Sequence, residues 1–173
     1  MSDRSSGRAA RRYRRVVPAV VFCLVALVAG VAVAANDWND AAIDWQGYDE
    51  GLAVAKSGNK PVCLVFYTEW CPHCQRYSQV FKDPALVEMT KKFVMIRVER
   101  DGNPAVSAKY KPDGEYIPRT YFLTPDGELQ PDIHEKRSNY LYFYNTSDPK
   151  AVMRGMQEAL DAAKPAGGGA SGV

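Results

Sequence analysis

The sequence predicts an α/β fold, a three-layer α/β/α sandwich with a central mixed sheet. Short apolar runs rich in β-branched and aromatic residues alternate with helical patterns along the chain. The run at 61–68 is apolar at nearly every position, which is typical of a strand buried on both faces. The chain has 173 residues, of which 46% are hydrophobic, which is enough for one ordinary core and too few for two full domains.

Helices and strands alternate in the first half of the body. In order, the predicted elements are a helix at 44–58, a buried strand at 61–68, helical patterns at 72–82 and 84–92, and a buried strand at 93–100. Asp44 or a neighbour is expected to cap the first helix, which ends near Gly58. The two helical patterns are expected either as separate pieces or as one kinked helix.

The second half ends in a hairpin and a closing helix. The predicted elements are a short helix at 103–111, a strand at 119–123, a tight turn at 124–127, a paired strand at 128–133 and a helix at 147–164. In the turn, Pro125 pre-sets φ and Gly127 allows a positive φ. Ser147 or Asp148 is expected to cap the closing helix. The segment 134–145 predicts a loop whose aromatic residues pack on the sheet.

The N-terminus carries a basic and then an apolar segment. The first fifteen residues hold six arginines and one aspartate, and residues 16–35 follow without a charge. This pattern ends in the small-residue motif Ala32-Val33-Ala34, which predicts a signal peptide or an N-terminal membrane anchor over residues 1–35. Cleavage near Ala34 or Ala35 is expected, with retention as an anchor as the alternative.

Either outcome exports the body of the protein, because the arginines stay on the inner side. We therefore expect a periplasmic protein, soluble after cleavage or anchored in the inner membrane through residues 16–35. The folded domain spans residues 36–164, and residues 165–173 form a flexible tail. Without the N-terminal arginines the body is slightly acidic, which argues against a nucleic-acid-binding surface.

The motif Cys71-Pro72-His73-Cys74 predicts a redox-active pair. Cys71 follows a buried strand and starts a helix, where free backbone N–H groups and the helix dipole stabilise a thiolate. Cys74 lies almost one turn later, so Cys71 is expected as the exposed nucleophile and Cys74 as the buried resolving thiol. Pro72 stiffens the first turn, and a positive charge on His73 would stabilise the thiolate and make the disulfide more oxidising.

A structural zinc site and a structural disulfide are the other two interpretations of the pair. A structural zinc site needs four ligands, and beyond the pair the body offers Cys63, His73 and His134. A structural disulfide would close too small a loop to stabilise the fold much. Redox chemistry is therefore favoured, with no metal and no cofactor, and Cys63 is expected as a small buried apolar residue.

These motifs resemble the thioredoxin superfamily. Trp70-Cys71-Pro72-His73-Cys74 follows an apolar strand, and Ile117-Pro118 precedes another strand roughly 45 residues later. The resemblance covers about residues 45–163 and implies a thioredoxin-like fold. It also implies a cis Pro118 that faces the cysteines and pairs through its neighbouring backbone with an extended client segment. Trp70, Ile117 and Pro118 are therefore expected to bind clients, although Trp70 would serve core packing equally well.

A narrower resemblance is to the small thioredoxin-like proteins of the anterior gradient group of the endoplasmic reticulum. It rests on PDGEYIPRTYFLTPDGELQPDI, on YLYFYN and on AVMRGMQEAL, and the leader suggests a bacterial exported relative. The CPHC motif itself is shared with DsbA-type oxidases. One departure concerns Val65, because many thioredoxins hold a buried aspartate at that place, six residues before the first cysteine. Cys74 therefore lacks that general base, and the exposed Glu69 is no obvious substitute.

For several other residues the sequence predicts a role or leaves two roles open. Tyr116 and Arg119 flank the Ile117-Pro118 segment and are expected either to touch the client or, for Arg119, to pair with an acid. His134 is expected to be an exposed loop residue. The tyrosines of the aromatic stretch predict sheet packing, with an exposed peptide-binding face as the alternative; they are Tyr140, Tyr142 and Tyr144.

The sequence thus predicts an exported thiol–disulfide oxidoreductase, of the oxidase or isomerase type, that acts on protein cysteines through Cys71 and Cys74. The alternatives are a periplasmic reductase for one client, such as an apocytochrome c, and a chaperone-like client-binding module. The expected partners are cysteine-containing clients and a redox partner protein. A monomer is expected.

Overall fold

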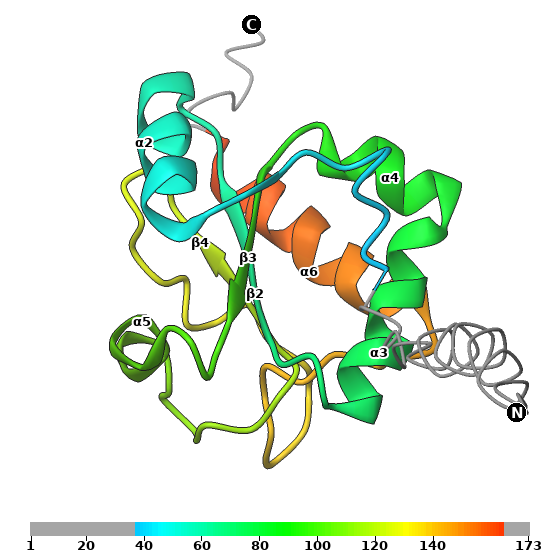
Figure 1. Cartoon of the computed structure of the whole chain (residues 1–173). Helices are drawn as coiled ribbons and strands as arrows, with labels where there is room; N and C mark the ends of the chain where they lie inside the picture. Colours follow the sequence, from blue (N-terminus) through cyan, green and yellow to red (C-terminus); the bar gives the residue numbers. More distant parts are fainter. Residues whose placement is uncertain (1–36, 165–173) are drawn as a thin grey trace, which may run out of the picture. The chain divides into compact units, whose positions relative to one another are not determined.

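A four-stranded mixed sheet forms the centre of the fold in the computed structural model, which describes residues 37–164. Its strands lie in the order β1 (Trp45–Gln46), β3 (Val94–Glu99), β2 (Val62–Tyr67) and β4 (Arg119–Leu123). β1 and β2 run parallel to β3, and β4 runs antiparallel to β2. The predicted mixed sheet is confirmed (Figure 1).

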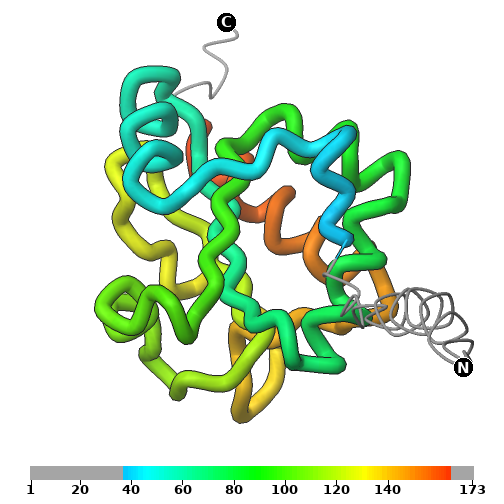
Figure 2. Tube along the Cα trace, viewed as in Figure 1, coloured from blue at the N-terminus to red at the C-terminus, as the bar shows by residue number. Residues whose placement is uncertain are grey.

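Helices cover both faces of this sheet and confirm the predicted three layers (Figure 1, Figure 2). The helices are α2 (Tyr48–Gly58), α3 (Pro72–Ser78), the 3₁₀ turn η1 (Gln79–Lys82), α4 (Pro84–Thr90), α5 (Pro104–Lys109) and α6 (Pro149–Ala162). Side chains of α2 and α5 pack on one face, and those of α3, α4 and α6 pack on the other. The sheet therefore separates two apolar layers.

The side chains of β2 alternate between two buried faces of the sheet, which explains why its sequence is apolar throughout. Successive strand side chains point to opposite faces, so Val62, Leu64 and Phe66 join the layer under α2 and α5. Cys63 and Val65 join the layer under α3 and α6. All five side chains are fully buried. Val65 therefore lies on the same side of the sheet as Cys74, in the same apolar layer.

The helix ends follow local chemistry. Asp83 caps α4 by accepting hydrogen bonds from the N–H groups of Ala85 and Leu86, at 2.9 and 3.0 Å. Asp148, the second of the two predicted candidates, caps α6. The expected cap of the first helix is wrong, because Gly47 takes that position without a side-chain bond and the helix starts at Tyr48. Asp44 lies before β1 instead.

The first of the two alternatives for the helical patterns after the cysteines is confirmed, because they form α3 and α4 as separate pieces with η1 between them. The strand β1 is too short to leave a periodic signal and was not predicted. The paired strand at 128–133 is wrong, since pairing stops after one bridge between Leu123 and Leu129. Pro131 cannot donate to a ladder and ends the pairing. The tight turn is confirmed, with Gly127 at φ 84°.

The aromatic segment forms an irregular loop along the free edge of β4. Thr120 N–H donates to the carbonyl of Tyr142 at 2.9 Å, and Glu135 N–H donates to the carbonyl of Leu141 at 2.8 Å, which closes the loop. Tyr142 and Tyr144 are buried, as sheet packing requires, whereas Tyr140 is 54% exposed. Sheet packing is therefore confirmed for Tyr142 and Tyr144, whereas Tyr140 lies on an exposed face.

Within residues 37–164 no helix has the length and apolar character needed to cross a bilayer. The predicted signal or anchor segment at 1–35 and the tail at 165–173 lie outside the described residues.

Candidate active site

Cys71 lies where the chain leaves β2 and enters α3. It is the N-cap residue of this helix, with extended backbone angles, and Pro72 occupies the first helical position. The N–H of Cys74 donates to the Cys71 Sγ at 3.4 Å. The Cys71 sulfur thus receives one of the N–H groups of the helix start that have no partner within the helix.

Cys74 is fully buried beneath Cys71. Burial raises the pKa of its thiol well above the ordinary value, and the hydrogen bond to Cys71 adds to this rise. A hydrogen bond from the backbone of Thr68 acts in the opposite direction but does not reverse it. All three cysteines in the described part of the chain are free thiols. The structure thus represents the reduced pair, with a thiol at Cys74 that resists deprotonation.

The expectation that Cys71 is exposed is wrong for the resting protein, since the residue is only 4% exposed. Its thiol points at the carbonyl oxygen of Ile117, with 4.0 Å between sulfur and oxygen. The peptide bond between Ile117 and Pro118 is cis, and Pro118 is buried while Ile117 is half-buried. The predicted meeting of the cysteine motif with the cis-proline segment is confirmed.

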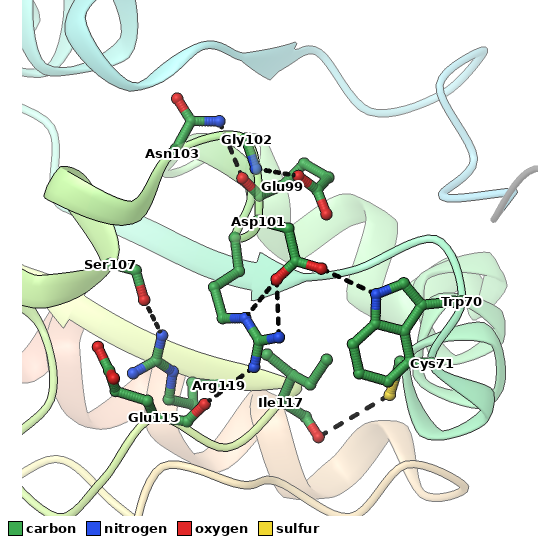
Figure 3. Close-up of polar contacts among 11 residues, drawn as sticks. Trp70, Cys71, Glu99, Asp101, Gly102, Asn103, Ser107, Glu115, Ile117 and Arg119 are labelled. Carbon is green, nitrogen blue, oxygen red and sulfur yellow. Dashed lines mark hydrogen bonds and ion pairs between the residues drawn. The ribbon is translucent and has the colours of Figure 1, made fainter.

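Trp70 is held beside the nucleophile by a polar network (Figure 3). Its side chain is 63% exposed, so the core-packing alternative is wrong. The indole Nε1 donates to Asp101 Oδ2 at 2.8 Å, and the guanidinium of Arg100 lies 5.7 Å from the indole ring. The hydrogen bond from Trp70 is the main cause that lowers the pKa of the Asp101 carboxyl. Trp70 therefore offers an exposed aromatic face in a defined orientation.

Arg100 extends this network to the cis-proline segment. Its guanidinium donates to Asp101 Oδ1 at 2.7 and 2.9 Å and to the carbonyl of Glu115 at 3.2 Å. Sequence reasoning missed both Arg100 and Asp101. Their only local signal is a charged pair at the carboxyl end of β3, next to the end of β2 that carries the cysteines.

His73 is exposed on the first turn of α3 and lies edge-on to Phe143, with 5.7 Å between the ring centroids. It stands between the two cysteines and away from the core. Its tuning of the cysteine pair by charge stays a prediction, and its contact with the aromatic loop was not expected.

The position six residues before Cys71, where the resemblance to thioredoxins implies a buried aspartate, holds an apolar residue in this chain. Val65 is fully buried in β2, and Glu69 lies on the exposed turn beyond the strand. Glu69 shares a hydrogen bond with the hydroxyl of Tyr67, whose pKa is raised chiefly by burial. Neither residue supplies a carboxylate inside the layer that holds Cys74.

Both predictions for Arg119, contact with a client and pairing with an acid, are wrong. It is fully buried, so it does not touch a client, and it pairs with no carboxylate in the described residues. Its Nη1 donates to the carbonyls of Tyr110 and Gly114, each at 3.0 Å, and its Nη2 donates to Ser107 Oγ at 2.6 Å. Arg119 thereby fastens the segment that leads into the cis-proline to α5.

The remaining candidates take structural positions. Cys63 is fully buried in β2, and burial raises the pKa of its thiol, as expected for an inert residue. His134 is half-buried rather than exposed, and its Nδ1 lies 2.8 Å from the carbonyl oxygen of Glu135. Over residues 37–164 no three histidine, cysteine or acidic side chains gather as metal ligands would.

Comparisons with known proteins agree with this geometry. A family model described as thioredoxin-like matches residues 44–125. The chain is 31% identical over 124 residues to the human anterior gradient protein 2 homolog, covering 71% of this chain and 69% of the relative. It is 33% identical over 126 residues to mouse anterior gradient protein 3, covering 71% and 74% of the two chains.

The fold also matches solved thioredoxins. The solution structure of a thioredoxin from Thermus thermophilus superposes with a TM-score of 0.56 at 21% identity, covering 70% of this chain and 90% of that chain. At this identity the match shows the fold, and the relatives above show the family. The chain therefore belongs to the thioredoxin superfamily, in its anterior gradient group, and with both cysteines of its CxxC motif in place it is a thiol–disulfide oxidoreductase.

Proposed function

We propose that this oxidoreductase is an exported disulfide oxidase and isomerase for protein clients. The observation that carries the proposal is the Cys71 sulfur at the helix start, which accepts the N–H of Cys74 at 3.4 Å while Cys74 itself is buried. In general, N–H groups at a helix start favour a thiolate on the sulfur that accepts them, and burial favours the thiol, as it does at Cys74. A stabilised reduced form makes the Cys71–Cys74 disulfide a stronger oxidant.

The oxidase reaction moves two electrons from a client to the pair. A client thiolate attacks Cys71 Sγ of the disulfide, which breaks the bond to Cys74 and releases a thiolate there that takes up a proton. A second client thiolate then attacks the client sulfur of the mixed disulfide and releases Cys71 as its thiolate. The client leaves with a new disulfide, and the pair, now reduced, must be reoxidised by a redox partner protein.

The isomerase reaction starts from the reduced pair and has no net electron transfer. The Cys71 thiolate attacks a client disulfide and forms a mixed disulfide, and another client thiolate later displaces Cys71. Cys74 competes with this second step, because its attack on Cys71 would release a reduced client. The raised pKa of Cys74 and the apolar Val65 slow that competing attack. A slow resolving thiol supports rearrangement of the client over its reduction.

The cis-proline segment and Trp70 support a protein client. Trp70 presents an exposed indole beside Cys71, and the backbone at Ile117 lies next to the Cys71 sulfur. An extended client segment that pairs with this backbone would place its own sulfur at Cys71. We therefore assign Trp70, Ile117 and Pro118 to client binding, and Pro72 and His73 to tuning of the pair.

Replacing His73 with glutamine should make the pair less oxidising. The change removes a titratable cation from the turn between the cysteines and should lower the reduction potential by about 20 mV, since an exposed charge is worth at most about 1 kcal/mol. Equilibration with glutathione buffers measures the shift. His73→Lys keeps a cation and is the control, so equal shifts for both variants would remove the role of charge.

The proposed location rests on the N-terminal sequence. A basic flank and the apolar segment 16–35 support export, with a mature chain that begins after Ala34 or Ala35. Mass spectrometry of the chain from the periplasmic fraction of a bacterial host tests this directly. The expected mass lacks the leader, an uncleaved membrane-bound chain would indicate an anchor, and an uncleaved chain in the cytoplasm would contradict export.

A further inference from the structure

A pocket of about 350 Å³ adjoins the nucleophile on the side of the aromatic loop. We call it the aromatic pocket, and its lining residues are Tyr116, Ile117, Arg137, Tyr140 and Phe143. The rings of Tyr116 and Tyr140 meet edge to face at 4.9 Å, and the guanidinium of Arg137 lies 5.5 Å from the centre of the Phe143 ring. Three aromatic side chains and one cation therefore face a common space.

The pocket is connected to the cysteine pair through two of its walls. Ile117 contributes to the pocket, and its carbonyl oxygen lies 4.0 Å from the Cys71 sulfur. Phe143 contributes to the pocket and contacts the ring of His73 within the motif. An extended chain advances about 3.3 Å per residue. A client side chain one to three residues from the reacting cysteine can therefore enter the pocket.

Hydrogen bonds hold the walls in place before a client arrives. The Tyr116 hydroxyl donates to Asp113, at 2.7 and 2.8 Å from its two carboxylate oxygens, and accepts from the N–H of Tyr142 at 3.0 Å. The same carboxylate accepts the N–H of Leu141 at 2.6 Å. Asp113 thus fastens the aromatic loop to the cis-proline segment. A preformed site loses less entropy on binding than a mobile one.

The cation of the pocket is available to a ligand. Among residues 37–164, the guanidiniums of Arg97, Arg100 and Arg154 each pair with a carboxylate, whereas that of Arg137 forms no ion pair and lies over the Phe143 ring. Arg137 and Tyr140 are both exposed. A carboxylate that approaches the rim of the pocket would therefore find an unpaired guanidinium with its donors free.

We infer that the aromatic pocket selects client segments that carry an aromatic residue and an acidic residue within a few positions of the reacting cysteine. The aromatic side chain would pack edge to face against Tyr140 and Phe143, and the carboxylate would pair with Arg137. The inference rests on the proposed function and adds a substrate class to it.

Four peptides with one cysteine test this selection. Each carries either Phe or Leu at one nearby position and either Asp or Asn at another, and each is blocked as a mixed disulfide with a reporter thiol. The rate constant for attack by Cys71 is measured in a Cys74→Ala background, where the first step is isolated. The peptide with Phe and Asp should react about tenfold faster than the peptide with Leu and Asn, as two contacts of about 0.7 kcal/mol each imply.

Variants of the pocket separate its two contacts. Arg137→Gln should remove the advantage of Asp over Asn and retain that of Phe over Leu, and Tyr140→Gly should do the reverse. Lys92→Gln is the control, because it removes an exposed cation just before the start of β3, at the end of the sheet away from the cysteines. It should leave the Asp-to-Asn and the Phe-to-Leu rate ratios unchanged. Equal rates for all four peptides, or the same ratios in Arg137→Gln and Tyr140→Gly as in the parent, would overturn the inference.

A second measurement keeps this inference apart from the proposed function. The same four sequences with Ser in place of Cys are labelled, and their affinity is measured by fluorescence anisotropy, which needs no exchange chemistry. The same order of preference should appear. If hydroxyethyl disulfide and the peptides all fail to react while this order persists, the proposed redox function is wrong and the pocket stands. Reaction with hydroxyethyl disulfide without any order among the peptides overturns the pocket alone.

Discussion

Replacing Cys74 with alanine should convert the protein into a covalent trap for its clients. Cys71 keeps its place at the start of α3 and still attacks client disulfides, but no second thiol can release the adduct from within the protein. Mixed disulfides should therefore accumulate in proportion to the protein added. Catalytic oxidation of a dithiol client should stop altogether, because the variant cannot form the intramolecular disulfide that accepts the electrons.

Non-reducing electrophoresis with mass spectrometry of the linked peptides measures this outcome. Cys63→Ala is the matched control, since Cys63 is equally buried in the same apolar layer but is not part of the motif. It should turn over clients and accumulate no adducts. Adducts linked through Cys63, or the absence of adducts from a Cys74→Ala protein that still binds clients, would contradict the assigned roles and favour a client-binding module.

Placing an acid at the site of Val65 should increase reduction of clients at the expense of stability. In the parent, attack by Cys74 should speed up by about tenfold per pH unit through the neutral range, because only its scarce thiolate reacts. Val65→Asp introduces a carboxylate into the apolar layer that holds Cys74, where it can accept the thiol proton. Release of the Cys71 mixed disulfide should therefore become faster and depend less on pH. Rapid-quench kinetics on a preformed mixed disulfide measure this release.

The stability cost has a definite pH dependence. Burial raises the pKa of the introduced carboxyl, so the folded state holds a proton that the unfolded state releases. The variant should resemble the parent most closely below about pH 4 and lose about 2–4 kcal/mol as the pH rises to 7. Arg97 lies opposite Val65 in β3 but already pairs with Asp40 at 2.8 Å, so it compensates only in part.

Val65→Asn is the control, because its amide is polar but does not titrate. It should be destabilised to the same degree at every pH and should not accelerate release. Urea unfolding at pH 4 and pH 7 separates the two variants. Equal acceleration by both would show that packing, and not a missing base, limits Cys74.

The layered fold could be predicted from the sequence because burial on both faces dictates apolar strands. β2 is apolar and buried at every position, β3 begins with three buried apolar residues, and α6 carries a cap and an apolar stripe. The two-residue strand β1 and the single bridge at Leu129 could not be predicted. Both depend on which backbone N–H and C=O groups are available for pairing at the edges of the folded sheet. The loop at 134–145 was predicted, but the long-range hydrogen bonds that hold it to Asp113 and Tyr116 leave no local pattern in the sequence.

The chemistry of the cysteine pair could also be predicted from neighbouring residues in the sequence, whereas the contacts that surround the pair could not. The position of Cys71 at a helix start follows from the order of strand, proline and helix. The bond between Trp70 and Asp101 joins residues 31 positions apart, and the closing of Ile117 over the Cys71 sulfur joins residues 46 apart. Such contacts depend on the packed sheet, so the sequence predicted an exposed nucleophile where the structure has a covered one.

The reduction potential of the Cys71–Cys74 pair tests the proposed direction of electron flow most directly. It is obtained by equilibrating the unaltered chain with glutathione buffers and measuring the oxidised fraction at each ratio. We predict a value between about −120 and −200 mV, the range of disulfide oxidases and isomerases. A value near the roughly −270 mV of thioredoxin would contradict the oxidase and isomerase assignment and favour a reductase for a specific client.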